Sequence, residues 1–295
     1  MKVALLAVFR NESHILEEFI RHYLNLGINR FYLTDNASTD DYHSILKKYK
    51  KFIKLHVMSK HVNSDDSDNI KHARLQRHCY AKMLRNVEED WALICDLDEF
   101  FYMRKGWSLN DLIRYAENEN ISQIVLPLKV FTSGGLIEQP NTVRDNFFDR
   151  VVHSKRMLTA HKMLVKKEKV RVLGITHASV TDGYTTDGDL KNKDGWHIDR
   201  PNFDVMMRNN SRTYPNLTYR HESDEIFKRS YICGNHYFNQ SREFYFNIKS
   251  KRGVIESIPR PYNRTTLYER RWHKFENMPK VKDYELYDLV KQGLL

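Results

Sequence analysis

The residues whose types and spacing best suit chemistry are three acids in the run Asp96-Leu97-Asp98-Glu99, which directly follows the apolar stretch 91–95 (WALIC). Two aspartates separated by one residue at the end of a buried strand direct their carboxylates toward the ligand edge of a sheet. Such hard oxygen ligands suit Mg²⁺ or Mn²⁺, which take further ligands from substrate phosphates. We therefore expect a divalent metal that neutralises a departing diphosphate, although Asp-x-Asp runs are also common in plain solvated loops.

The elements around these acids alternate between strands and helices. A continuous apolar run over residues 3–9 predicts a strand buried on both faces, and apolar positions at helical spacing over 15–24 predict a helix that ends at Gly27. Further strands are predicted at 30–34, 52–58 and 91–95, and further helices at 42–49 and 73–87. This alternation indicates an α/β fold with a doubly wound, mostly parallel sheet flanked by helices, whose ligands bind outside the carboxyl ends of the strands.

Polar residues also follow the first two predicted strands. Arg10, Asn11 and Glu12 come after the first strand, and Asp35 and Asn36 come after the second. These neighbouring carboxyl ends would form a pocket for a nucleoside, in which the carboxylate of Asp35 accepts hydrogen bonds from a base or a ribose. The alternative for these residues is helix capping and turn formation.

The pattern becomes less regular in the second half of the chain. Its predicted segments are a strand at 123–131, a flexible loop at 132–135, a candidate hairpin of 161–167 with 169–175, a long loop at 181–210 and a last strand at 231–238. Ser241 then caps a helix that runs to about residue 252. The remainder is a basic, aromatic-rich tail that prolines interrupt.

Composition limits the class of protein without choosing a function. The 295 residues are 41% hydrophobic, enough for a sizeable core, and the formal charge of +10 favours anionic partners such as nucleic acid, a membrane surface or an acidic glycan. Three cysteines without a CxxC pair suggest neither a disulfide framework nor a zinc site. Since no run of about 18 apolar residues and no signal-peptide pattern is present, we expect a cytoplasmic protein.

Three stretches of the sequence resemble the nucleotide-sugar half and the later part of family 2 and family 92 type glycosyltransferases. They are FRNESHILEEFIRHYLNLGINRFYLTDNASTDD, DLDEFF and GNHYFNQSREFYFNIKSKRG. The resemblance spans about residues 1–255, and its middle matches only through Ser133, Gly134, Arg144, Phe147, Arg150, Lys162 and His177. It implies a GT-A fold over 1–255, with a nucleotide-sugar-binding half at 1–130, an acceptor-side half at 131–255 and a separate tail at 256–295.

The resemblance also implies ligands and site residues. The donor would be a UDP- or GDP-sugar, the acceptor a glycan or glycolipid in polysaccharide biosynthesis, and the cofactor Mn²⁺ or Mg²⁺ held by Asp96 and Asp98. His236 would be a third metal ligand, although a single histidine on its own more often serves packing or a surface role. The nucleotide-sugar-binding residues would be Phe9, Arg10, Asn11, Glu12, Asp35, Asn36, Gln76, Asp96 and Leu97.

An inverting transferase needs a base that takes the proton of the acceptor hydroxyl. Glu243, at the start of the helix after the last strand, lies where related enzymes carry such a base, although a helix start also favours acids. Asp182 and Asp187 in the glycine-rich loop compete with it, and Glu99 would orient the metal shell. The same loop would close over the donor, with Tyr184 and Trp196 stacking on sugar, or would be inert surface.

Other functions remain open at this point. A nucleotidyl- or phosphotransferase would use the same metal and diphosphate, but neither a GxxxxGK[ST] nor a GxGxxG motif is present. A basic nucleic-acid-binding module would place Lys and Arg where this chain has acids, and a catalytically dead glycan-binding relative would not need both Asp96 and Asp98. The basic run Arg270-Arg271-Trp272-His273-Lys274 of the tail would touch a membrane surface or an anionic acceptor, or pack as plain structure.

Overall fold

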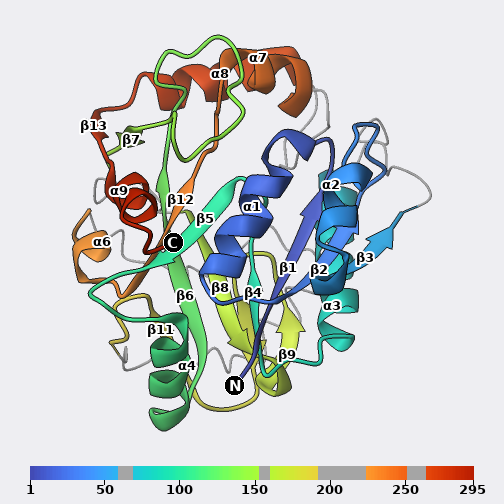
Figure 1. The fold of residues 1–295 in the computed structure, drawn as a ribbon, viewed down its shortest axis with the longest axis vertical. Helices are drawn as coiled ribbons and strands as arrows, with labels where there is room; N and C mark the ends of the chain where they lie inside the picture. Colours follow the sequence, from blue (N-terminus) through green and yellow to red (C-terminus); the bar gives the residue numbers. More distant parts are fainter. Residues whose placement is uncertain (59–68, 153–159, 192–223, 251–263) are drawn as a thin grey trace.

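The first half of the chain builds four parallel strands at one side of a large sheet (Figure 1). The computed structural model describes residues 1–58, 69–152, 160–191, 224–250 and 264–295. The strands of this half are β1 (Val3–Phe9), β2 (Arg30–Asp35), β3 (Ile53–Val57) and β4 (Trp91–Ile94), in the spatial order β3-β2-β1-β4. The predicted strands of the first half are therefore confirmed, and their carboxyl ends meet at one edge of the sheet.

Helices cover both faces of these strands because the side chains of β1 alternate between two apolar clusters. Leu5 and Ala7 pack with α1 (Ser13–Asn25), whereas Ala4 and Leu6 pack with α3 (Asn69–Arg85). The first cluster also takes in α4 (Leu109–Asn118), while the short α2 (His43–Lys48) lies beside α1. Burial on both faces is what the continuous apolar run of β1 predicts.

The second half turns the sheet into a mixed one. Antiparallel β8 (Ala160–Lys166) lies between β4 and β6 (Ile121–Val130), and β12 (Ile232–His236) runs parallel to β6 and antiparallel to β5 (Glu99–Met103). A ninth strand, β11 (Tyr184–Asp187), also pairs with β6. Among the described residues, five strand pairings of this sheet are parallel and three are antiparallel. The predicted α/β fold with a mostly parallel sheet is confirmed.

The predicted hairpin of 161–167 with 169–175 is wrong. Both strands exist, but β8 hydrogen-bonds to β4 and β6 on its two sides and leaves no free edge for its successor. The short helix η2 (Lys167–Lys169) instead leads the chain out of the sheet. Beyond it, β9 (Val170–Leu173) pairs with β10 (Ala178–Val180) in a separate two-stranded sheet.

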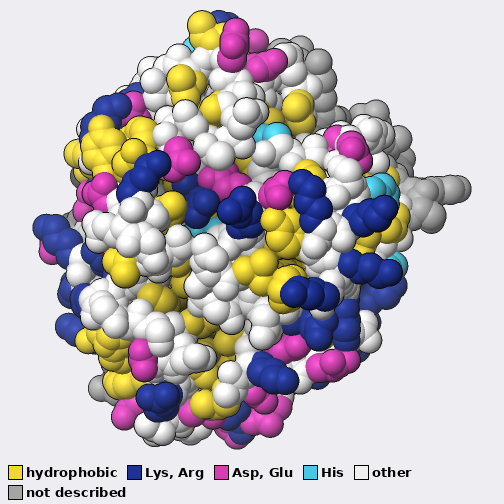
Figure 2. Space-filling model, in the orientation of Figure 1, with side chains coloured by type: hydrophobic (Ala, Val, Ile, Leu, Met, Phe, Trp, Pro, Cys, Tyr) yellow, Lys and Arg dark blue, Asp and Glu magenta, His cyan; other side chains and the backbone are white. Residues whose placement is uncertain are grey.

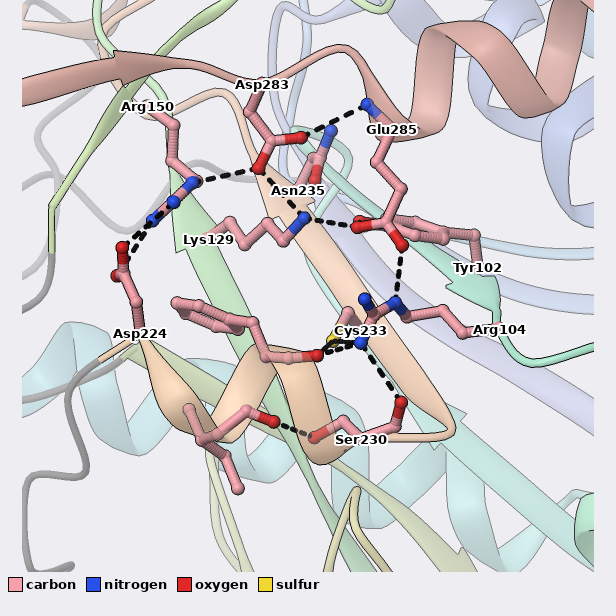
Figure 3. A network of polar contacts seen from close by, with 12 residues as sticks. Tyr102, Arg104, Lys129, Arg150, Asp224, Ser230, Cys233, Asn235, Asp283 and Glu285 are labelled. Carbon is pink, nitrogen blue, oxygen red and sulfur yellow. Dashed lines mark hydrogen bonds and ion pairs between the residues drawn. The ribbon is translucent and has the colours of Figure 1, made fainter.

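The predicted tail packs onto the body of the protein. It contains α8 (Arg264–Glu276), β13 (Lys280–Lys282) and α9 (Glu285–Lys291), and β13 pairs with β7 (Asp149–Val151). Two acids of this segment meet the buried Lys129 of β6, whose ammonium lies 2.9 Å from Asp283 and 2.6 Å from Glu285 (Figure 3). Arg150 and Arg104 extend the ion pairs on either side, and Leu286 enters the main apolar core.

Lysine side chains gather on one part of the surface. Figure 2 shows Lys and Arg over the region where α2, β3 and α3 lie in Figure 1. The α2–β3 segment has five exposed lysines, Lys47, Lys48, Lys50, Lys51 and Lys54. Among the described residues, no helix has the length and apolar character needed to cross a membrane.

Two buried histidines make the stability of this fold dependent on pH. Burial, reinforced by Arg144, lowers the pKa of His22 to about 3, and burial beside His161 lowers the pKa of His177 to about 4. Since both lie below the usual 6.5, the unfolded chain binds protons that the folded chain does not. The contribution of each histidine to stability is therefore complete above pH 6.5 and is lost as the pH falls, toward about 3 for His22 and about 4 for His177.

We expect each of these histidines to lower the free energy of unfolding by about 1.4 kcal/mol per pH unit across that window. In His22→Gln, urea unfolding at a series of pH values should therefore show a shallower decline than in the wild type. The exposed His273 of α8 provides the control, because His273→Gln should leave the slope unchanged. Equal slopes in the wild type and His22→Gln would contradict the assignment.

Candidate active site

Three acids and a histidine meet where β4 ends and β5 begins, because antiparallel pairing of β12 with β5 sets His236 opposite Glu99. His236 Nε2 lies 3.5 Å from Asp98 Oδ1, and His236 Nδ1 lies 3.9 Å from Glu99 Oε1. One ligand atom from each of these three residues falls within 4.8 Å of the others. We refer to Asp96, Asp98 and Glu99 as the acidic cluster.

The turn of the acidic cluster is closed by Glu99 itself. The backbone N–H of Asp96 donates to Glu99 Oε2 at 2.9 Å, and the backbone N–H of Glu99 donates to the carbonyl of Asp96 at 3.1 Å. Glu99 Oε1 therefore remains for His236. The backbone N–H of Tyr237 donates to the carbonyl of Asp98, which ties the end of β12 to the same turn.

Asp96 occupies a more open position than the other two acids. Its side chain is 30% exposed, against 8% for Asp98 and 2% for Glu99. Asp96 Oδ1 accepts hydrogen bonds from Tyr80 Oη at 3.0 Å and Gln76 Nε2 at 3.1 Å. Asp96 is thus the member of the acidic cluster that reaches solvent, and Gln76 is held beside it by α3.

Each aspartate of the acidic cluster is paired with a buried lysine. Lys162 Nζ of β8 lies 2.6 Å from Asp96 Oδ2 and 3.6 Å from Glu99 Oε2. Lys249 Nζ lies 2.9 Å from Asp98 Oδ2. Both lysine side chains are less than a tenth exposed, so their charges act at close range with little screening.

These contacts and the burial of the site shift the pKa values of Asp98 and Glu99 in opposite directions. Although burial opposes the charged form of Asp98, Lys249 and His236 hold the pKa of its carboxyl well below the usual range. Burial raises the pKa of Glu99 well above its usual value, since Lys162 only partly compensates for Asp96 and Asp98. Burial would lower the pKa of Lys162, but Asp96 and Glu99 raise it.

The donor set fits a divalent metal. Carboxylate oxygens of Asp98 and Glu99 and an imidazole nitrogen of His236 are ligands that Mn²⁺ accepts, and Mg²⁺ favours the oxygens. His236 Nδ1 is buried without a hydrogen-bond partner among the described residues, although it faces Glu99. A cation between His236 and Glu99 would be a partner for both side chains.

The two loops predicted to bind a nucleoside lie side by side and are joined by hydrogen bonds. The backbone N–H of Asn11 donates to Ser38 Oγ, and Asn11 Oδ1 accepts from the backbone N–H of Thr39. Both oxygens of Asp35 take part in the turn, because Oδ1 accepts from the backbone N–H of Ser38 and Oδ2 accepts from Tyr42 Oη. The contact of Asp35 with a nucleoside stays a prediction.

Other residues predicted to bind the donor lie at the same edge. Asn36 donates its backbone N–H to the carbonyl of Phe9, and Glu12 is the residue that precedes α1. The side chains of Phe9 and Leu97 are in the apolar core, so only their backbone faces the edge. Gln76 Oε1 is buried and has no hydrogen-bond partner among the described residues, which leaves an acceptor for a ligand N–H or O–H.

The three candidate bases lie in different places. Glu243, in α7 (Arg242–Phe244), follows β12, and its Oε2 accepts from the backbone N–H of Gln139. Asp187 ends β11 beside Val125, five residues before the Val130 that pairs with His236, and Asp182 forms an exposed ion pair with Lys169. Only Glu243 therefore follows the strand that carries His236.

The rest of the predicted loop is only partly described. The backbone of Gly183 has a φ of +79°, and Tyr184 is an exposed residue at the start of β11 rather than part of a loop. Trp196 lies outside the described residues.

Sequence reasoning missed the roles of both lysines. Lys162 directly precedes the apolar run Met163-Leu164-Val165 of β8, a pattern that indicates a buried charge with a partner. No comparable sequence pattern marks Lys249. The helix that Ser241 caps changes to a π-helix at η3 (Tyr245–Lys249), so helical spacing does not predict the direction of this side chain. That change decides which way the side chain at 249 points.

Comparisons with known proteins show similarity at the family level. The model of glycosyltransferase family 92 matches residues 5–221, a range that contains the acidic cluster and Lys162 and ends before His236 and Lys249. A glycosyltransferase family 92 protein of Ricinus communis is 26% identical over 192 residues. That match covers 62% of this chain and 32% of the Ricinus protein, so the chain spans about a third of its relative.

Solved structures show weaker similarity. S. aureus TarS (residues 1–349) in complex with UDP matches 57% of this chain and 47% of its own, with 14% identity and a TM-score of 0.38. Glucosyl-3-phosphoglycerate synthase from Mycobacterium tuberculosis, in complex with Mn²⁺, UDP and phosphoglyceric acid, matches 45% of this chain and 44% of its own. Its identity is 13% and its TM-score 0.27.

The geometry predicts unequal effects for two lysines of β8. Lys162→Met should lower the free energy of unfolding by about 3–5 kcal/mol, because it removes the buried ammonium that faces the buried Glu99 and the partly exposed Asp96. Lys166→Met, four residues along the strand, removes the more exposed pairs with Glu117 and Glu168 and should cost about 1 kcal/mol or less. Urea denaturation measures both, and similar losses would contradict the buried pairing.

Proposed function

The chain belongs to glycosyltransferase family 92, and from that premise we propose that it moves a sugar from a nucleotide-diphosphate sugar to a hydroxyl acceptor in a metal-dependent reaction. The observation that carries the proposal is the convergence of Asp98, Glu99 and His236 beside the partly exposed Asp96. The site lies at the carboxyl end of β4, where ligands of open α/β sheets bind.

Asp98, Glu99 and His236 would hold the metal, and Asp96 would face the donor. A bound Mn²⁺ or Mg²⁺ supplies positive charge for the diphosphate that leaves. The protein contributes a rigid frame, because Tyr80, Gln76 and Lys162 fix Asp96 and the Glu99 carboxylate closes the turn. This pre-organisation means that little energy is spent on arranging the site when the donor binds.

The donor would lie across the carboxyl ends of β1, β2 and β4. The free acceptor atom Gln76 Oε1 and the backbone around Asn11 and Asn36 would contact its ribose or base. A uridine or guanosine diphosphate sugar has the hydrogen-bond donors that this set requires. The acceptor is proposed to be a glycan or glycolipid, with peripheral membrane contact through the basic tail.

Glu243 would act as the base of an inverting single displacement. Its carboxylate takes the proton of the acceptor hydroxyl while that oxygen bonds to the anomeric carbon, and the bond from this carbon to the nucleoside diphosphate breaks. Glu243 lies in α7, the next helix after β12, and this position supports its role over Asp182 and Asp187.

A thermal-shift panel of nucleotide sugars with and without Mn²⁺ tests the proposed donor and metal. A UDP- or GDP-sugar should raise the melting temperature of the wild type only when Mn²⁺ is present, because the cation joins the acidic cluster to the diphosphate. Asp98→Asn should abolish this shift, whereas Asp90→Asn, at the exposed start of β4, should retain it. The same shift in both variants would refute the metal-bridged site.

A second experiment tests the base. Glu243→Gln should lower kcat by about 10²–10⁴, since the amide cannot take the acceptor proton, while affinity for the donor is unchanged. Glu138→Gln provides a matched control, because Glu138 is an exposed acid one residue from the Gln139 that Glu243 contacts. Transfer assays on purified protein measure both, and full activity in Glu243→Gln would remove this residue from the mechanism.

A further inference from the structure

The segment from Tyr42 to Met58, which contains α2 and β3, has five lysines and no acidic residue. It supplies +5 of the formal net charge of +10, although it is a small part of the 295 residues. Protein surfaces usually intersperse both signs of charge. A surface segment of one sign therefore favours an anionic partner.

Three of these lysines have no acidic partner. Lys47, Lys50 and Lys51 are exposed, and none of them forms an ion pair in the described part of the chain. The other two lysines of the segment each have a carboxylate oxygen within 3.0 Å. The charge of the three unpaired lysines is therefore screened only by the ions of the solvent.

The unpaired lysines belong to elements that lie on the same side of the sheet as two exposed apolar side chains. Leu46 of α2 and Leu33 of β2 are both in the apolar cluster that packs with α1, so α2 covers this side. Leu55 of β3 pairs with Leu33, and Val57 follows two residues later, so both side chains point to the side that α2 covers. Leu55 is 37% and Val57 50% exposed. We call the following residues the lysine surface: Lys47, Lys50, Lys51, Leu55 and Val57.

Protection of an edge strand does not account for the lysine surface. β3 is the last strand at one end of the sheet, and charged side chains on such a strand often prevent pairing with another chain. The one lysine of β3 is Lys54, which lies over the ring of Tyr32 on the side of α3 and is paired with Glu88. The three unpaired lysines precede the strand, in α2 and η1 (Lys50–Phe52), where they do not guard its edge.

The residue types favour a lipid surface over a nucleic acid. Nucleic-acid-binding surfaces use Arg, whose planar guanidinium binds phosphate with two hydrogen bonds, and exposed aromatic rings that stack on bases. The segment 42–58 has no arginine, and its Tyr and Phe side chains are buried or partly buried. Lysines attract anionic headgroups as point charges, and exposed Leu and Val side chains can enter the boundary between headgroups and acyl chains.

We propose that the lysine surface binds an anionic lipid bilayer, with its three lysines on the headgroups and Leu55 and Val57 at the boundary of the acyl chains. This surface is separate from the basic run of the tail, because α8 lies at the top of Figure 1 and α2 and β3 lie at its right. The contact needs neither a metal nor a nucleotide sugar. It therefore goes beyond the proposed transfer reaction and stands or fails independently of it.

Co-sedimentation of the purified protein with vesicles tests this contact. The vesicles consist of phosphatidylcholine alone, or of phosphatidylcholine and phosphatidylserine in equal amounts. The wild type should prefer the vesicles with phosphatidylserine, and added salt should release it, since ions screen the attraction between lysines and headgroups. The triple variant Lys47→Gln, Lys50→Gln, Lys51→Gln should bind these vesicles at least about tenfold more weakly.

Two controls separate the lysine surface from general effects of charge and apolarity. The triple variant Lys2→Gln, Lys105→Gln, Lys228→Gln removes the same charge from exposed lysines elsewhere and should bind like the wild type. Val57→Ser should weaken binding about threefold, because it removes an apolar group that enters the bilayer. Val281→Ser, at a similarly exposed valine of β13, should not weaken it.

Four results would overturn the proposal. Equal losses in the two triple variants would indicate an effect of net charge alone. Full binding by the variant of Lys47, Lys50 and Lys51 would leave the basic tail as the membrane contact. The same affinity of the wild type for both kinds of vesicle would exclude recognition of anionic headgroups. Binding of the wild type to a labelled oligonucleotide but to neither kind of vesicle would assign the lysines to nucleic acid. The thermal-shift panel tests the proposed function separately from all four.

Discussion

Neutralisation of carboxylates buried at the end of β4 is the constraint on which the rest of the site depends. Counted over the whole residue, Asp98 is only 5% and Glu99 only 1% exposed. An uncompensated charge on such a buried residue would lower the free energy of unfolding by several kcal/mol. The chain meets this requirement with cationic or hydrogen-bonding groups from three separate segments: Lys162, His236 and Lys249. The fold must therefore bring residues about 150 positions apart onto one turn.

Strand register achieves this convergence. The antiparallel pairing of β8 with β4 ends at the pair Ile94 and Met163. Lys162, the residue before Met163 in the sequence, therefore lies beside the acidic cluster. The pairing of His236 with Glu99 does the same for β12 and β5. A slip of one residue in either pairing would turn the side chain to the other face of the sheet. The mixed character of the sheet is thus what completes the site.

The sequence predicted the helices and strands whose pattern of apolar residues is local. The apolar runs of β1, β2 and β4 and the helical spacing of α1 predict their elements, and the placement of Asp96 and Asp98 after β4 follows from them. Partners across the sheet are a different matter, because pairing of β8 with β4 and β6 depends on edges that no local pattern reveals. The same limit explains the incorrect hairpin and the unpredicted roles of Lys162 and Lys249.

The basic, proline-interrupted sequence of the C-terminal segment did not predict how this segment packs against the sheet. Asp283 and Glu285 neutralise Lys129 on β6, and Lys129 is the residue that pairs with Asn235, the neighbour of His236 on β12. A buried lysine at this register needs acidic partners, and among the described residues its ion pairs are with Asp283 and Glu285. The segment beyond residue 279 is therefore part of the frame that fixes β12, and the position of His236 depends on it as much as on the sheet.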